Sequence, residues 1–80
     1  MRWSFPRLRA SKTEEEQLDK VREEIYEFES EQDTQAKDIE ALDIYHAAET
    51  LIRIRFKGRG KQLRALTDAV IRKNRNRGKY

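Results

Sequence analysis

The chain has 80 residues, of which 18 are Lys or Arg and 15 are Asp or Glu, and it contains no cysteine. A chain of this length forms one domain and buries only about 60–65% of its unfolded surface, so a lone monomer is marginally stable. The lack of cysteine excludes disulfides and thiolate-based zinc or iron–sulfur sites. No apolar run approaches the ~20 residues that span a bilayer, and no signal-peptide core is present. We therefore expect a cytoplasmic protein that forms oligomers and has no membrane partner.

The charges are segregated along the chain. Residues 1–12 carry a net charge of +4, residues 13–50 carry −11 and residues 51–80 carry +10. A uniformly basic nucleic-acid-binding protein does not show this pattern. We expect a basic irregular arm over residues 1–12, one all-α domain over 13–73 and a basic tail over 74–80.

The first helix is predicted over residues 13–31. Two capping-box patterns lie at its start, Ser11 with Glu14 and Thr13 with Glu16. The apolar residues that follow recur at intervals of three and four, which places them on one helical stripe: Leu18, Val21, Ile25 and Phe28. We expect this stripe to be the buried face of the helix.

The second helix is predicted to begin at Thr34 or Lys37, with Asp33 or Thr34 as its N-cap, and to end near Phe56. Its apolar residues cover most of its circumference, which indicates packing on more than one side. In a chain this short, we expect the second side to meet another subunit.

Gly58 and Gly60 are predicted to end the second helix through caps with positive φ angles or through a turn. A third helix follows over residues 61–73, and no strand pattern of useful length appears. The predicted fold is all-α, a helical hairpin plus a third helix. A homodimer or homotetramer would complete a four-helix-type bundle from it.

Four acidic residues are notable for their spacing. Glu24 and Glu27 are three apart on the first helix, and Glu40 and Asp43 are three apart on the second, so each pair lies on one helical face. The second pair lies in a helix that is otherwise largely apolar, where carboxylates are costly unless a positive group joins them. Mg²⁺ or Mn²⁺ would suit such oxygen ligands. The alternative is that these acids form a solvated surface.

The acidic segments carry a resemblance to a known family. EEIYE at residues 23–27 and EALD at residues 40–43 resemble the EExxE…ExxD pattern of MazG-like nucleotide pyrophosphohydrolases, an all-α superfamily. The segments LDIYHAAETLIR and VIRKNRNRGKY resemble small phage-encoded members, which implies a bacterial cell as the location. The resemblance covers about residues 14–80.

The resemblance implies hydrolysis of a nucleoside triphosphate between the α and β phosphates, which gives a monophosphate and pyrophosphate. It implies that Mg²⁺ is bound by four carboxylates: Glu24, Glu27, Glu40 and Asp43. Glu23 and Glu24 are the implied catalytic residues, with Glu23 either supporting the ligands or orienting and activating water.

The basic C-terminal end contains residues that match the KNxxR element of that family. Lys73, Asn74 and Arg77 are therefore predicted to bind phosphate, with Gly78 letting the tail turn close to a ligand. The alternative is a solvated basic tail. His46, three residues after Asp43, is expected to support the carboxylates without binding the metal itself.

The chain departs from the family in its short N-terminus, because members have a full helix before the EExxE helix. Trp3 or Phe5 could stack on a nucleotide base. Alternatively, these aromatic side chains could pack the N-terminal arm against the rest of the protein. A cluster of cations near the end of the second helix could offset the acidic helix or bind nucleic acid nonspecifically: Arg53, Arg55, Lys57, Arg59 and Lys61.

Two other functions stay open at this point. One is a non-enzymatic helical adaptor or nucleic-acid-associated phage protein. The other is a degenerate family member that binds nucleotide without turnover.

Overall fold

The computed structural model describes residues 2–9 and 12–80, and these residues form three helices and no strand. The helices are α1 (Glu14–Ser30), α2 (Thr34–Arg55) and α3 (Gly60–Asn76). The predicted all-α class is therefore confirmed. None of these helices is long and apolar enough to cross a membrane.

The start of α1 is fixed by a capping box. The Glu16 amide donates to Thr13 Oγ1 at 3.1 Å, and the Thr13 amide donates to Glu16 Oε1 at 3.0 Å. The bonds to Thr13 hold the pKa of Glu16 below its ordinary value, since they favour the charged carboxylate. The Thr13–Glu16 pattern is thus the one used. The alternative cap, Ser11, lies outside the described residues.

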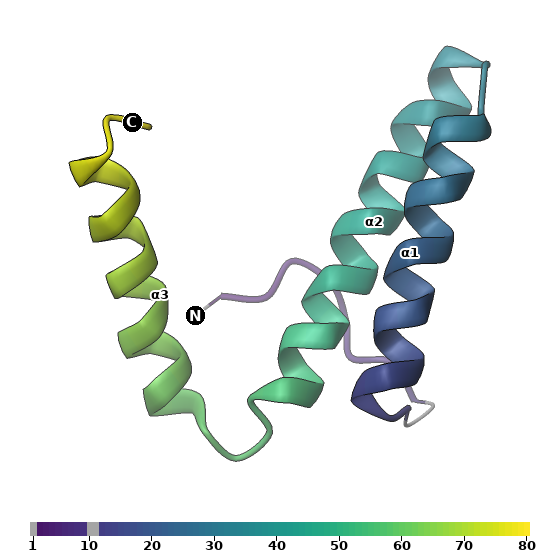
Figure 1. Ribbon diagram of the computed structural model, residues 1–80. Coiled ribbons are helices and arrows are strands. Elements are labelled where there is room, and N and C mark those ends of the chain that lie inside the picture. Colours follow the sequence, from purple (N-terminus) through teal and green to yellow (C-terminus); the bar gives the residue numbers. More distant parts are fainter. Residues whose placement is uncertain (1, 10–11) are drawn as a thin grey trace.

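A short turn joins α1 to α2 in an antiparallel hairpin (Figure 1). Asp33 caps α2 by accepting a hydrogen bond from the Ala36 amide at 2.8 Å, so α2 begins at Thr34 rather than at Lys37. Lys37 then reaches back across the turn. Its Nζ donates to the Phe28 carbonyl at 2.8 Å and lies 4.1 Å from the centroid of the Phe28 ring.

The face of α1 that packs against α2 is more polar than predicted. Its buried side chains are Gln17 and Glu24, whereas Leu18 and Ile25 are 37% and 40% exposed. The prediction that the whole apolar stripe is buried was therefore wrong. The reason is that the polar side chains find partners in the hairpin: Gln17 Nε2 donates to the Ala47 carbonyl at 2.9 Å.

The N-terminal arm packs along α2 and covers part of its second side. The amides of Ser4 and Phe5 donate to the Glu49 carboxylate at 2.9 and 2.8 Å. The Phe5 ring stacks on His46 with centroids 4.5 Å apart, and Arg53 Nη2 donates to the Phe5 carbonyl at 2.7 Å. Phe5 is therefore a packing anchor. The arm thus covers part of the circumference of α2 within one chain.

Glycines shape both ends of α3. Gly58, in the turn before it, has a φ of +73°, whereas Gly60 is the first residue of α3 and does not end α2 as predicted. At the other end, the helix continues three residues past its predicted limit, to Asn76. Cations in the last turn favour this extension through the helix dipole.

A Schellman motif ends α3. Gly78 has a φ of +72°, its amide donates to the Arg75 carbonyl, and the Lys79 amide donates to the Asn74 carbonyl, both at 3.0 Å. Gly78 thus terminates the helix, which gives it a structural role beside the ligand-related one predicted from the sequence.

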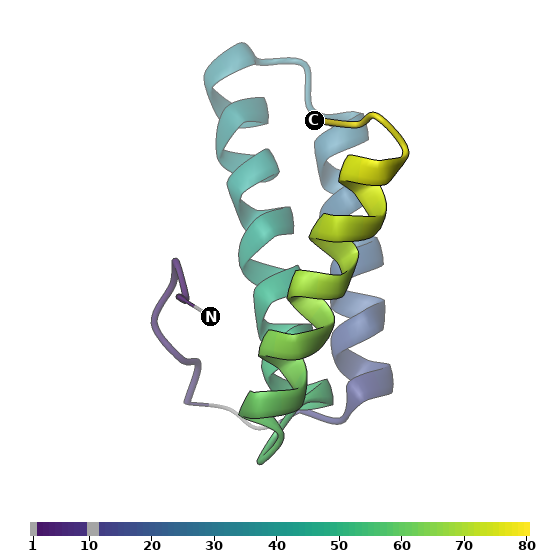
Figure 2. The ribbon, with the colours of Figure 1, turned by 90° about the vertical axis from the view of Figure 1, so that its left-hand side faces the viewer.

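The third helix diverges from the α1–α2 hairpin (Figure 1), and in the view of Figure 2 it lies in front of the hairpin. Among the described residues, the backbone of α3 comes close to neither α1 nor α2. Leu66 and Val70 on α3 are 45% and 48% exposed, and the buried apolar residues of the described chain are Ala47 and Leu63. One chain therefore leaves much of its apolar surface uncovered.

Candidate metal centre

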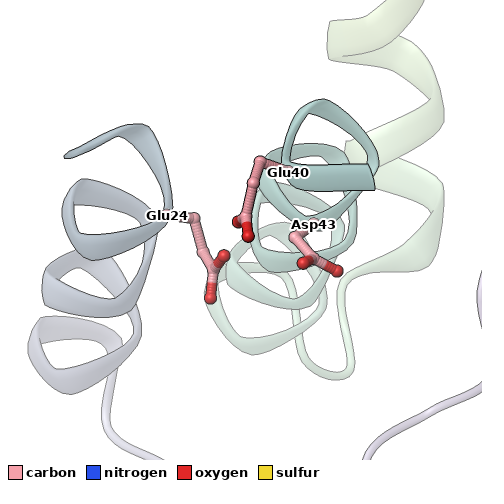
Figure 3. A group of neighbouring side chains, drawn as sticks. All are labelled: Glu24, Glu40 and Asp43. Atoms are coloured by element: carbon pink, nitrogen blue, oxygen red, sulfur yellow. The ribbon is translucent and has the colours of Figure 1, made fainter. Parts of the chain in front are cut away.

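Three carboxylates from both helices of the hairpin meet at one place. Glu24 comes from α1, and Glu40 and Asp43 come from α2; in Figure 3 their side chains converge between the helices. One oxygen from each residue lies within 4.8 Å of the others. The two i,i+3 pairs singled out in the sequence thus contribute three of their four acids to this group, and the antiparallel hairpin brings them together.

The burial of the cluster makes it unusual. The Glu24 side chain is only 8% exposed, and its Oε1 lies 2.9 Å from Lys20 Nζ. Glu24 Oε2 and Glu40 Oε2 are both buried and have no hydrogen-bond partner among the described residues. A buried carboxylate oxygen without a partner costs free energy, and a hard divalent cation would satisfy several such oxygens at once. The cluster therefore fits Mg²⁺ or Mn²⁺ in its chemistry.

The other two predicted acids lie at the edge of this group. Glu27 is half-buried beside it, and burial together with the charges of Glu24, Glu40 and Glu23 raises its pKa above the ordinary value. Glu23 is 57% exposed, and its Oε2 lies 3.6 Å from Lys20 Nζ. Glu27 thus shares the negative field of the cluster, whereas Glu23 faces solvent.

His46 lies next to the carboxylates, as the sequence led us to expect. It lines a pocket of about 100 Å³ together with Glu24 and Asp43. Its Nε2 is buried without a hydrogen-bond partner among the described residues, while its ring is held by Phe5. The N-terminal arm therefore fixes the imidazole beside the cluster.

The predicted phosphate-binding residues lie elsewhere in the monomer. Lys73 and Asn74 are in the last turns of α3, and Arg77 is its C-cap. Since the backbone of α3 does not approach the hairpin, one chain does not bring these residues to the three carboxylates.

Sequence reasoning missed the role of Lys20. Its Nζ pairs with the buried Glu24 carboxylate, and this hydrogen bond raises the pKa of Lys20. The signal was present, because Lys20 and Glu24 are four residues apart and therefore share one face of α1. Lys20 supplies the positive charge that lets a carboxylate be buried in this hairpin.

Comparison with known proteins adds no relative: no protein-family model, curated protein or solved structure matches the chain significantly.

Proposed function

We propose that the protein is a Mg²⁺-dependent nucleoside triphosphate pyrophosphohydrolase that resembles the MazG-like superfamily. The observation that supports this most directly is the cluster of buried Glu24 with half-buried Glu40 and Asp43, in which two buried carboxylate oxygens lack partners among the described residues. A solvated acidic surface would not bury these oxygens. The resemblance to the EExxE…ExxD pattern adds the reaction class: water cleaves the bond between the α and β phosphates, which gives a nucleoside monophosphate and pyrophosphate.

In this proposal, each residue of the cluster has a defined task. Glu24, Glu40 and Asp43 hold Mg²⁺, and Glu27, at the edge of the group, joins them when the cation neutralises their repulsion. Bound Mg²⁺ supplies neutralisation of phosphate charge and acidification of water. Glu23, which faces solvent, would accept a proton from incoming water, and His46 would support the carboxylates from the pocket wall.

A second copy of the chain would complete the assembly. Ile39 and Leu42 of α2 are 54% and 57% exposed, and α3 carries its own exposed apolar residues. The hairpin, residues 14–55, carries −9 and residues 60–80 carry +6, so α3 and the tail of one copy would complement the hairpin of another in charge as well as in apolar surface. Such packing would form a homodimer or homotetramer and bring Lys73, Asn74 and Arg77 toward the carboxylates.

A screen for pyrophosphate release tests the proposal. Ribo- and deoxyribonucleoside triphosphates are supplied with Mg²⁺ or Mn²⁺, and turnover is compared with that of Glu24→Gln and Asp43→Asn. We expect both variants to keep the fold and to lose at least a hundredfold in turnover, because each removes a metal-binding charge. The matched controls are Glu15→Gln on α1 and Asp38→Asn on α2, both exposed, which should retain activity.

The two alternatives give different results in the same experiment. A degenerate member would bind Mg²⁺ through Glu24 and Asp43 but release no pyrophosphate from any nucleotide. A helical adaptor or nucleic-acid-associated protein would show neither turnover nor Mg²⁺-dependent stabilisation. Unchanged Mg²⁺ binding and turnover in both cluster variants would contradict the enzyme proposal.

A further inference from the structure

A larger pocket lies beside the carboxylates, between the N-terminal arm, the end of α2 and the start of α3. Its volume is about 430 Å³, which falls within the range of small-molecule binding sites. Trp3 and Phe56 contribute aromatic walls, and Leu63 contributes an apolar one.

The charged side chains that line this pocket all have the same sign. Five of its lining residues are cationic and none is acidic: Arg7, Arg9, Lys12, Arg53 and Lys57. Of these, only Arg53 forms an ion pair with a described residue, at 4.0 Å from Glu49. The other four cations form no ion pair within the described chain, although the charge of Lys12 helps to lower the pKa of Glu16. Like charges gathered in this way repel one another unless an anion joins them.

Arg53 gives the pocket a fixed wall. Its side chain is only 12% exposed, its Nη2 donates to the Phe5 carbonyl at 2.7 Å, and its guanidinium lies 4.7 Å from the centroid of the Trp3 ring. Arg53 Nε is buried and has no hydrogen-bond partner among the described residues. The arm and α2 therefore hold this guanidinium in place before any ligand arrives, which lowers the entropic cost of binding.

This basic pocket adjoins the pocket that contains the carboxylates. Both are lined by Leu8, Lys12 and Thr50, while Glu24 and Asp43 line only the smaller one. A ligand that extended across Lys12 would place a positive end at the carboxylates and a negative end at Arg53. A metal–polyphosphate has that distribution of charge.

We propose that the basic pocket of Arg7, Arg9, Lys12, Arg53 and Lys57 binds the phosphate chain of a nucleotide. This proposal deepens the proposed function and rests on it for the identity of the ligand. It assigns phosphate recognition within one chain to the N-terminal arm and the end of α2, with guanidinium and ammonium groups as donors to phosphate oxygens.

Inorganic tripolyphosphate, in the presence of a chelator, tests the pocket without metal or turnover. Binding is measured by calorimetry on the full chain. The double variant Arg7→Gln/Lys57→Gln removes two pocket cations, and the control Arg64→Gln/Arg72→Gln removes two exposed cations of α3 outside the pocket. Both variants lower the net charge equally, so a general electrostatic effect would weaken binding equally in both.

We expect the pocket variant to bind tripolyphosphate about tenfold more weakly, and the control to change by less than about twofold, because charge-assisted hydrogen bonds are lost only in the first. Equal weakening in the two variants would overturn the proposal. So would weakening confined to a third variant, Lys73→Gln/Arg77→Gln, since phosphate recognition would then belong to α3. Circular dichroism confirms that each variant is folded.

Two further results distinguish this proposal from nucleic-acid binding and from the proposed enzyme activity. If the native chain ignores tripolyphosphate but binds a single-stranded oligonucleotide through Arg7 and Lys57, the pocket serves nucleic acid and the proposal is wrong. If tripolyphosphate binds through the pocket but no nucleotide is hydrolysed, the proposed enzyme activity fails and the phosphate site stands.

Discussion

Lys20 lies one helical turn before Glu24 on α1, and its Nζ is 2.9 Å from Glu24 Oε1. The ammonium therefore neutralises one carboxylate of a cluster in which two buried oxygens, Glu24 Oε2 and Glu40 Oε2, have no hydrogen-bond partner in the part of the chain that the structure describes. A divalent cation at the cluster and the Lys20 ammonium would bind the same carboxylate. The two cations are thus coupled, and changing one should alter the effect of the other.

Replacing Lys20 with Met should have opposite effects with and without Mg²⁺. Without metal, the buried Glu24 carboxylate loses its partner, and the free energy of unfolding should fall by about 1–3 kcal/mol. With Mg²⁺, the carboxylates bind the cation without competition, so the increase in melting temperature on adding Mg²⁺ should be larger than in the native chain. Thermal unfolding over a Mg²⁺ titration measures both effects.

The control for this prediction is Arg22→Met. Arg22 pairs with Asp19 on the exposed side of α1, where both side chains are about two-thirds exposed. Loss of this ion pair should therefore change neither the free energy of unfolding nor the response to Mg²⁺ appreciably. An identical response of the two variants to Mg²⁺ would show that Lys20 has no special link to the cluster.

Replacing Glu27 with Gln should stabilise the metal-free protein near neutral pH. The folded-state pKa of Glu27 is raised, first by burial and then by Glu24 and Glu40, so its ionisation opposes folding as the pH rises through that pKa. Below its ordinary value of 4.5, Glu27 is protonated in both states and the substitution should have little effect. Melting temperatures at several pH values test this, with exposed Glu29→Gln as the control.

The N-terminal arm should detach from α2 in acid. Burial favours the neutral form of Glu49, but the amides of Ser4 and Phe5 and the charge of Arg53 outweigh it, so the pKa of Glu49 is lowered. Because the pKa of Glu49 is lower in the folded state, its ionised carboxylate stabilises the fold above pH 4.5, the ordinary pKa. This stabilisation is lost as the pH falls through the lower pKa of the folded state.

Trp3 reports this detachment, since it is the one tryptophan of the chain and it packs against Arg53. Its fluorescence should change over the acidic range in the native chain. In Glu49→Gln the transition should be absent. A transition of equal size in both proteins would mean that Glu49 does not control the arm.

The buried side chain of Gln17 should contribute to the stability of the hairpin, although it is polar. Gln17 is 1% exposed and donates to the Ala47 carbonyl, so Gln17→Ala removes a hydrogen bond between the helices and leaves a cavity. We expect a loss of about 2 kcal/mol in the free energy of unfolding, measured by urea denaturation. Exposed Gln35→Ala on α2 should cost less than about 0.5 kcal/mol.

Self-association should depend on the exposed apolar residues of α3. Leu66→Gln/Val70→Gln should shift the sedimentation coefficient toward that of a monomer, because these residues are 45% and 48% exposed in one chain and have no other role in it. Asp68→Asn, on the opposite side of α3, should leave the sedimentation coefficient unchanged. A native chain that sediments as a monomer at all concentrations would contradict the proposed assembly.

Local sequence signals predicted the helices well. The capping box of Thr13 and Glu16 marks the start of α1, and Asp33 marks the start of α2. Each cap is made by residues within three positions of one another, so the sequence shows it directly. The convergence of Glu24 with Glu40 and Asp43 was also predictable, because it needs only i,i+3 spacing and a short turn between antiparallel helices. Only the end of α3 was placed too early, because the helix continues to Asn76 before the Schellman motif at Gly78 terminates it.

The sequence by itself thus determined the three helices, the acidic pairs and the segregation of charge. Only the tertiary structure decided which residues are buried, because the rotation of α1 against α2 follows from partners distant in sequence, such as Ala47 for Gln17. It also decided where the arm lies, since Glu49 binds backbone amides more than 40 residues away. The basic pocket arises in the same way: its cations come from both ends of the hairpin sequence, and only the fold brings Arg7 and Arg53 to one cavity.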